Sequence, residues 1–167
     1  MTSRPTPKSP RAGTAPKSAP ATGSALAFLQ AEKGFLEADR EGAGTPAAAK
    51  AVVIPFGLEA SVSYGGGTAK GPAAILEASK ALELFDEELW REPYRDWGVA
   101  TLAPVRIASP NAAALDQLAG LVEGVVAEDK FPLVLGGEHA LTPGAIRPLV
   151  ARHPDLVVLQ LDAHADL

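Results

Sequence analysis

Short apolar runs recur along the second two-thirds of the chain, separated by stretches with helical spacing. Three runs are the clearest, at Ala51–Gly57, Phe131–Leu135 and Leu156–Leu161, and Val99–Leu102 is a shorter candidate. Each run is short, rich in branched residues and bounded by polar or glycine-containing segments. Such a run is typical of a strand that is buried on both faces.

Helical patterns lie between these strands. Pro72 is expected to begin a helix that runs to about Phe85, because proline is favoured in the first helical position. Ser109-Pro110 and Thr142-Pro143 begin two more, and the last is expected to extend to about Arg152. Strands that alternate with helices predict an α/β domain whose parallel sheet is covered on both faces.

The first 49 residues have a different character. Residues 1–24 are rich in Pro, Ala, Ser, Thr and Gly, and they hold four basic residues and no acidic one. We expect a disordered extension there, since its prolines exclude the continuous amphipathic helix of a transit peptide. A short helix over 25–40 and a Gly/Ala linker over 41–49 would then lead into the domain at 50–167.

Charge and composition narrow the possible partners. The chain has 15 basic and 20 acidic residues, for a net charge of −5, so the part after the basic extension is strongly acidic. An acidic body argues against nucleic acid as the partner. No apolar stretch reaches the length of a membrane-spanning helix, and the N-terminus lacks the apolar core of a secretory signal. The absence of cysteine excludes disulfides and thiolate sites and is compatible with a cytoplasmic protein.

The clearest chemical signal follows the last apolar run. Asp162, His164 and Asp166 alternate there with alanines. A strand interior disfavours aspartate, and an unpaired buried carboxylate is costly, so packing explains these residues poorly. Carboxylate and imidazole together suit Mn, Zn, Fe or Ni better than Ca. Alternate side chains of an extended segment lie about 6.6 Å apart, so one ion requires the segment to curl, whereas a carboxylate can also bridge two ions. The alternative is a capping aspartate in a solvated loop.

A second polar group, Gly136-Gly137-Glu138-His139, ends the preceding strand. Ligands of parallel sheets bind beyond the carboxyl ends of the strands, and consecutive strands are often neighbours. We therefore expect His139 to face the same crevice as the Asp162–Asp166 run. The two glycines would allow a sharp turn and a close backbone approach. Glu138 would serve either as an acceptor for a ligand histidine or as a loop charge.

The glycine-rich loop Gly65–Gly71 raises the possibility of phosphate binding. A P-loop requires Lys and then Ser or Thr after its last glycine, but Pro72 stands there, and the dinucleotide spacing is also absent. We expect a turn that packs a helix near the crevice. The chain also lacks the Gly-x-Ser-x-Gly element of serine hydrolases.

The two polar motifs resemble the first two metal motifs of the ureohydrolases, the family of arginase and agmatinase. Val53–Ser79, with Ser63-Tyr64 and Gly71-Pro72, is similar to the N-terminal region of agmatinase-like members, and the resemblance covers about residues 50–167. It implies a three-layer α/β/α fold with a parallel sheet, arginase-like and truncated here. It also implies hydrolysis of a guanidinium group to urea and an amine.

The resemblance assigns metal-binding roles by position. His139 and Asp166 would bind one manganese ion, His164 would bind the second, and Asp162 would bridge the two. Ala140 replaces the serine that usually follows the histidine of the first motif. The family takes two further aspartate ligands from a later motif, so we expect this chain to be inactive alone and to bind manganese weakly.

The expected activity of the intact protein is conversion of agmatine to putrescine and urea, a step of polyamine metabolism. Its partner would be a small guanidino substrate, and relatives imply a homo-oligomer. Arginase, guanidinobutyrase or formiminoglutamase activity is the alternative within the family. A vestigial, non-catalytic interaction protein and a generic metallohydrolase are the alternatives outside it.

Overall fold

The computed structural model describes residues 26–37 and 44–165. The predicted extension at 1–24 and the candidate ligand Asp166 lie outside the described residues. The elements that position the candidate site all lie within the described part.

A parallel sheet of three strands forms the centre of the molecule. Its strands are β1 (Ala51–Phe56), β2 (Val99–Thr101) and β3 (Phe131–Gly136), in the order β2-β1-β3. Ala51 pairs with Val99 on one side and with Phe131 on the other. β1 is central, and its residues 52–56 are buried. This confirms the parallel sheet and three of the four predicted strands.

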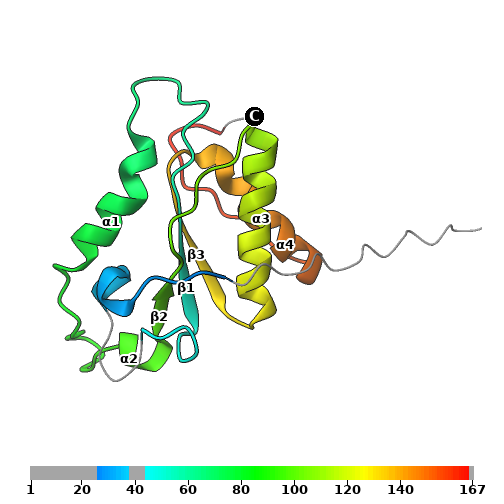
Figure 1. Ribbon diagram of the computed structural model, residues 1–167. Helices are drawn as coiled ribbons and strands as arrows, with labels where there is room; N and C mark the ends of the chain where they lie inside the picture. The colour runs from blue at the N-terminus through cyan, green and yellow to red at the C-terminus, as the bar shows by residue number, and fades with distance from the viewer. Residues whose placement is uncertain (1–25, 38–43, 166–167) are drawn as a thin grey trace, which may run out of the picture.

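Helices cover both faces of this sheet. α1 (Gly71–Ser79) lies on one face, and α3 (Asn111–Ala127) and α4 (Thr142–Arg152) lie on the other (Figure 1). The short α2 (Tyr94–Trp97) lies near the start of β2. The three layers of the predicted α/β/α fold are therefore present. None of the described helices is long and apolar enough to cross a membrane.

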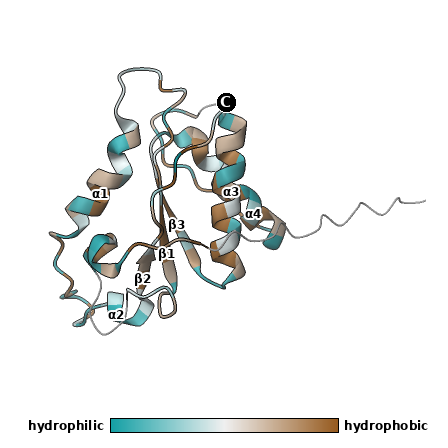
Figure 2. Ribbon diagram, viewed as in Figure 1, coloured by the Kyte–Doolittle hydropathy of each residue, from teal (hydrophilic) through white to brown (hydrophobic). Residues whose placement is uncertain are grey.

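The main core lies between β1 and α3. Val52, Ile54 and Phe56 of β1 are fully buried, as are Leu118 and Val122 of α3. Alternate residues of a strand and residues at helical spacing each form one apolar face, so these two elements bury their faces against each other. Figure 2 shows the hydrophobic colouring concentrated on the sheet and the inner side of α3. α1 is shorter than predicted, since it ends at Ser79 while Leu82 and Phe85 are exposed beyond it.

The expected helix over 25–40 has a different form in its described part, 26–37. Phe28 forms an antiparallel bridge with Leu102, and the Leu29 N–H donates to the Thr101 carbonyl oxygen at 2.8 Å. Two 3-10 turns follow, η1 (Ala31–Lys33) and η2 (Phe35–Glu37). The segment therefore makes backbone hydrogen bonds with the outer edge of β2. In an α-helix its N–H and C=O groups would bond to one another and would not be available to the strand.

The prediction of a strand at 156–161 is wrong. The described chain after α4 is irregular and exposed, and Leu161 retains 90% of its accessible surface. An apolar run forms a strand only where a neighbouring strand accepts its backbone hydrogen bonds. Among the described residues β3 pairs only with β1, and the chain after α4 does not take up its other edge.

Candidate metal site

His139 follows β3 at the carboxyl edge of the sheet, where the backbone passes very close to the loop after β1. An added Cβ at Gly137 would lie 2.1 Å from the Leu58 carbonyl oxygen, and one at Gly136 would lie 2.5 Å from Leu141 Cδ2. Neither distance is possible for a real side chain. The contact at Gly137 is with backbone, so that position requires glycine, whereas a side chain at Gly136 would have to displace the Leu141 side chain. The glycines were expected to let the backbone approach the site; the close approach that the structure shows is to Leu58, in the loop after β1.

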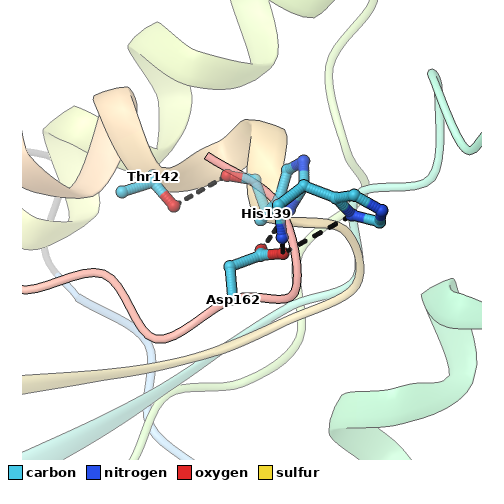
Figure 3. Close-up of polar contacts among 4 residues, drawn as sticks. His139, Thr142 and Asp162 are labelled. Atoms are coloured by element: carbon cyan, nitrogen blue, oxygen red, sulfur yellow. Dashed lines mark hydrogen bonds and ion pairs between the residues drawn. The ribbon is translucent and has the colours of Figure 1, made fainter. Parts of the chain in front are cut away.

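His139 and Asp162 meet at this edge (Figure 3). His139 Nδ1 lies 3.1 Å from Asp162 Oδ2, across 23 residues of sequence. The Thr142 hydroxyl, at the start of α4, donates to the His139 carbonyl oxygen at 2.7 Å and so fixes the turn η5 (His139–Leu141) that presents the imidazole. The expected meeting of the two motifs therefore occurs, although the segment before Asp162 is not a strand.

Asp162 is the central group of this cluster. The His164 N–H donates to Asp162 Oδ1 at 3.0 Å, and His164 Nδ1 lies 4.0 Å from the same oxygen. The Asp162 side chain is 22% exposed, whereas that of His139 is 66% exposed. The hydrogen bond from the His164 N–H has the largest effect on the Asp162 carboxyl and lowers its pKa below the ordinary value. Desolvation acts to raise this pKa, and the hydrogen bond to the His139 side chain lowers it further. Asp162 is therefore ionised at neutral pH, as a metal ligand must be.

The donors that meet here are chemically suited to manganese, because imidazole nitrogen and carboxylate oxygen both bind it. Within the described ranges no group of three or more His, Asp or Glu side chains is arranged to hold a metal ion. The described residues thus join His139 to Asp162 and leave His164 at the margin, while Asp166 is outside them. The described residues therefore fit manganese in the type of their donor atoms and in the closeness of one pair, His139 and Asp162.

Glu138 anchors the neighbouring loop. Its carboxylate accepts the Ser61 N–H at 2.9 Å and the Ser61 hydroxyl at 2.9 Å, and its own N–H donates to the Leu58 carbonyl oxygen at 2.9 Å. Desolvation acts to raise the pKa of Glu138, but the two Ser61 donors and others outweigh it and hold the pKa below the ordinary value. The sequence left two roles open for Glu138, an acceptor for a ligand histidine or a loop charge. Neither describes it fully, because Glu138 ties the β1 loop to the His139 turn.

Glu59 plays a similar part in the glycine-rich loop, and sequence reasoning missed it. Its Oε2 accepts N–H groups from Gly67 and Ala69, each at 2.8 Å, and the Thr68 hydroxyl at 3.0 Å. These hydrogen bonds, with Ala69 the strongest, lower the pKa of Glu59. The Gly67 and Ala69 amides are thus bound to a carboxylate, which disfavours phosphate binding, and the 3-10 turn Thr68–Lys70 leads directly into α1. An acidic residue shortly before a glycine-rich run is the sequence signal that could have indicated this role of Glu59.

A groove of about 880 Å³ adjoins the His139–Asp162 pair. It runs between α4 and residues 158–162, and Ala140 lies in its lining. The branched apolar residues in that lining are Ile146, Val150, Val158, Leu159 and Leu161. A second cavity, of about 450 Å³, lies between η2 and the segment 80–92 and shares no lining residue with the groove.

Known proteins resemble the chain in both sequence and structure. The N(1)-aminopropylagmatine ureohydrolase of Synechocystis sp. is 38% identical over 146 residues, which are 84% of this chain and 47% of the relative. The agmatinase of Bacillus cereus is 35% identical over 71% of this chain and 41% of its own length. The chain thus spans less than half the length of these curated relatives.

Two solved structures share the fold. The agmatine ureohydrolase of Thermoplasma volcanium matches with a TM-score of 0.53 and 31% identity, over 60% of this chain and 34% of that one. A Clostridium difficile protein proposed to be an agmatinase matches with a TM-score of 0.63 and 20% identity, over 70% of this chain and 42% of that one. The Arginase family model matches residues 49–167. The chain therefore belongs to the arginase family of ureohydrolases.

Proposed function

We propose that the protein containing this chain hydrolyses a linear guanidino compound, with agmatine as the substrate and urea and putrescine as the products. The observation that supports this is the 3.1 Å contact between His139 and Asp162, which joins the two motifs at one edge of the sheet. The names of the Bacillus cereus and Thermoplasma volcanium relatives support agmatine.

We further propose that His139, Asp162, His164 and Asp166 hold two manganese ions. When bound, these ions supply Lewis-acid activation of the water that attacks the guanidinium carbon. Asp162 enters the site already ionised, because the His164 N–H stabilises its carboxylate. Thr142 and Glu138 hold the turn from both sides, so His139 is presented without a large cost of ordering.

The reaction balances without any other reactant. The water oxygen bonds to the guanidinium carbon, and the bond from that carbon to the alkylated nitrogen breaks. This nitrogen takes up the two protons of the water and leaves as the protonated amine, while the water oxygen, the carbon and its two remaining nitrogens form neutral urea. A planar guanidinium is a poor electrophile because its charge is delocalised, so both activation of water and accurate placement are needed.

Urea release by the purified product of the complete reading frame tests this proposal. The protein is loaded with manganese and offered agmatine, arginine, guanidinobutyrate and formiminoglutamate, with formamide assayed for the last. We expect turnover of agmatine, and loss of that turnover in Asp162→Asn. The 167-residue chain alone is expected to be inactive. Absence of product from every compound would refute the proposal and favour a non-catalytic interaction protein.

A longer guanidino compound, N(1)-aminopropylagmatine, is the second candidate substrate. The observation in its favour is the 38% identity to the Synechocystis enzyme over 84% of this chain. The ratio of kcat/KM for agmatine and N(1)-aminopropylagmatine separates the two, because it measures differential binding of their transition states. We also propose that the protein is cytoplasmic and forms a homo-oligomer. We propose in addition that residues 50–167 form a domain distinct from residues 1–49.

A further inference from the structure

The loop between β1 and α1 is held at two points beside the candidate site. Glu138, next to His139, binds Ser61 near the start of the loop, and Glu59 binds Gly67 and Ala69 near its end. In Figure 1 this loop rises from the same end of the sheet as the segment after α4. The Ser61 end of the loop is therefore tied to the His139 turn, while Glu59 binds the two ends of the loop to each other.

Tyr64 lies between these two anchors and is 100% exposed. In the described part of the chain its ring has no aromatic or cation–π contact, unlike Trp90, which packs edge-on against Phe85. Tyr64 follows Ser61 by three residues, and three extended residues span at most about 11 Å. Ser61 is bonded to Glu138, the residue beside His139, so Tyr64 lies no more than three residues along the chain from a point tied to the His139 turn.

The backbone after Tyr64 turns in a way that only glycine adopts readily. Gly65 has φ +67° and Gly67 has φ +119°, and a Cβ at either position would meet nothing within 4 Å. Conformation rather than crowding therefore requires glycine at these two positions. The turn presents a large aromatic ring to solvent, where it gains nothing from burial in the described structure.

We propose that Tyr64 is a substrate-binding residue that contacts the end of the substrate remote from the guanidinium. This inference rests on the proposed function. If the guanidinium carbon reacts at His139 and Asp162, the rest of a linear substrate extends away from that pair across the carboxyl edge. The face of an aromatic ring attracts a cation, so Tyr64 favours substrates that end in an ammonium group. Anchoring by Glu59 and Glu138 reduces the cost of ordering the loop when substrate binds.

Two variants and two ligands test this inference in the product of the complete reading frame. Tyr64→Leu removes the aromatic face, and Tyr64→Phe retains it. The ligands are agmatine and pentylguanidine, in which a methyl group replaces the ammonium; the second is measured as a substrate or as a competitive inhibitor. We expect Tyr64→Leu to raise KM for agmatine about fivefold, corresponding to about 1 kcal/mol, with kcat within about twofold. Tyr64→Phe should behave like the wild type, and neither variant should change the affinity for pentylguanidine.

Trp90→Leu is the matched control, because Trp90 is a 79% exposed aromatic residue outside the candidate site. It should leave both parameters unchanged. An unchanged KM for agmatine in Tyr64→Leu would overturn the inference, and so would equal losses for agmatine and pentylguanidine, which indicate a structural role. An active wild-type enzyme with either result leaves the proposed function intact. A wild-type protein that releases no urea refutes the proposed function and this inference together.

Discussion

Replacement of Gly137 by alanine should destabilise the fold at the point where the candidate site is built. The new Cβ would lie 2.1 Å from the Leu58 carbonyl oxygen, 3.0 Å from its carbonyl carbon and 3.1 Å from its nitrogen. All three atoms are backbone, so no side-chain rotation relieves the contact. The β1 loop and the β3 turn must separate by about 1 Å to reach an ordinary contact distance.

That separation has a second cost. The same Leu58 oxygen accepts the Glu138 N–H at 2.9 Å, and this hydrogen bond is stretched beyond a useful length when the two backbones move apart. Overpacking typically costs about 1–3 kcal/mol and a lost hydrogen bond about 1 kcal/mol. We therefore expect Gly137→Ala to lower the free energy of unfolding by about 2–4 kcal/mol, a large fraction of the about 5–15 kcal/mol typical of a domain.

Urea-induced unfolding followed by circular dichroism measures this change. Gly120→Ala is the matched control: Gly120 lies in α3, and its added Cβ would meet nothing within 4 Å. Alanine is favoured over glycine in a helix by about 0.5–1 kcal/mol, so the control should be slightly more stable than the wild type. If the free energy of unfolding of Gly137→Ala lies within about 0.5 kcal/mol of the wild-type value, the close approach at Leu58 is not required for stability.

Three further predictions concern the groups around the site. Ser61→Ala removes the hydroxyl donor to Glu138 and should raise the pKa of that carboxyl, which NMR titration measures. The free energy of unfolding should fall by only about 0.5–1 kcal/mol, because the contact is exposed. An unchanged Glu138 pKa would contradict the contact. Since the folded pKa of Asp162 lies below its ordinary value of 3.8, its stabilising effect is present above that pH and is lost as pH falls through the folded pKa. The difference in unfolding free energy between wild type and Asp162→Asn should therefore shrink on acidification, and a constant difference would refute this assignment. Calorimetric titration of the 167-residue chain with manganese should show weak binding that Asp162→Asn abolishes, whereas tight stoichiometric binding would contradict the expectation drawn from the ligand set.

The strands and helices were predictable to different degrees. β1 and β3 are continuous apolar runs, α3 begins directly after Ser109-Pro110 and α4 begins at Thr142-Pro143, so local pattern was enough to locate them. The run at 156–161 is equally apolar but forms no strand in the structure. An apolar run indicates that a segment prefers to be buried. Whether it forms a strand depends on whether the sheet offers an edge strand for it to pair with.

The candidate site shows the same division. The spacing of Asp162 and His164 and their type were enough to identify metal-competent side chains, because ligand chemistry is a property of the residue itself. The role of Glu138 was not predictable to the same degree. The Ser61–Glu138 contact joins residues 77 positions apart, and no local pattern specifies which distant donor a carboxylate will find.

The amino-acid sequence by itself determined the class of fold, the family resemblance and the four candidate metal ligands, since periodicity and side-chain chemistry are local properties. Only the tertiary structure decided that His139 Nδ1 lies 3.1 Å from Asp162 Oδ2, and that Glu138 ties the Tyr64 loop to the turn that carries His139. These are contacts between segments far apart in sequence. They depend on how parallel strands and their connecting loops are placed in space, which hydrophobic pattern alone does not specify.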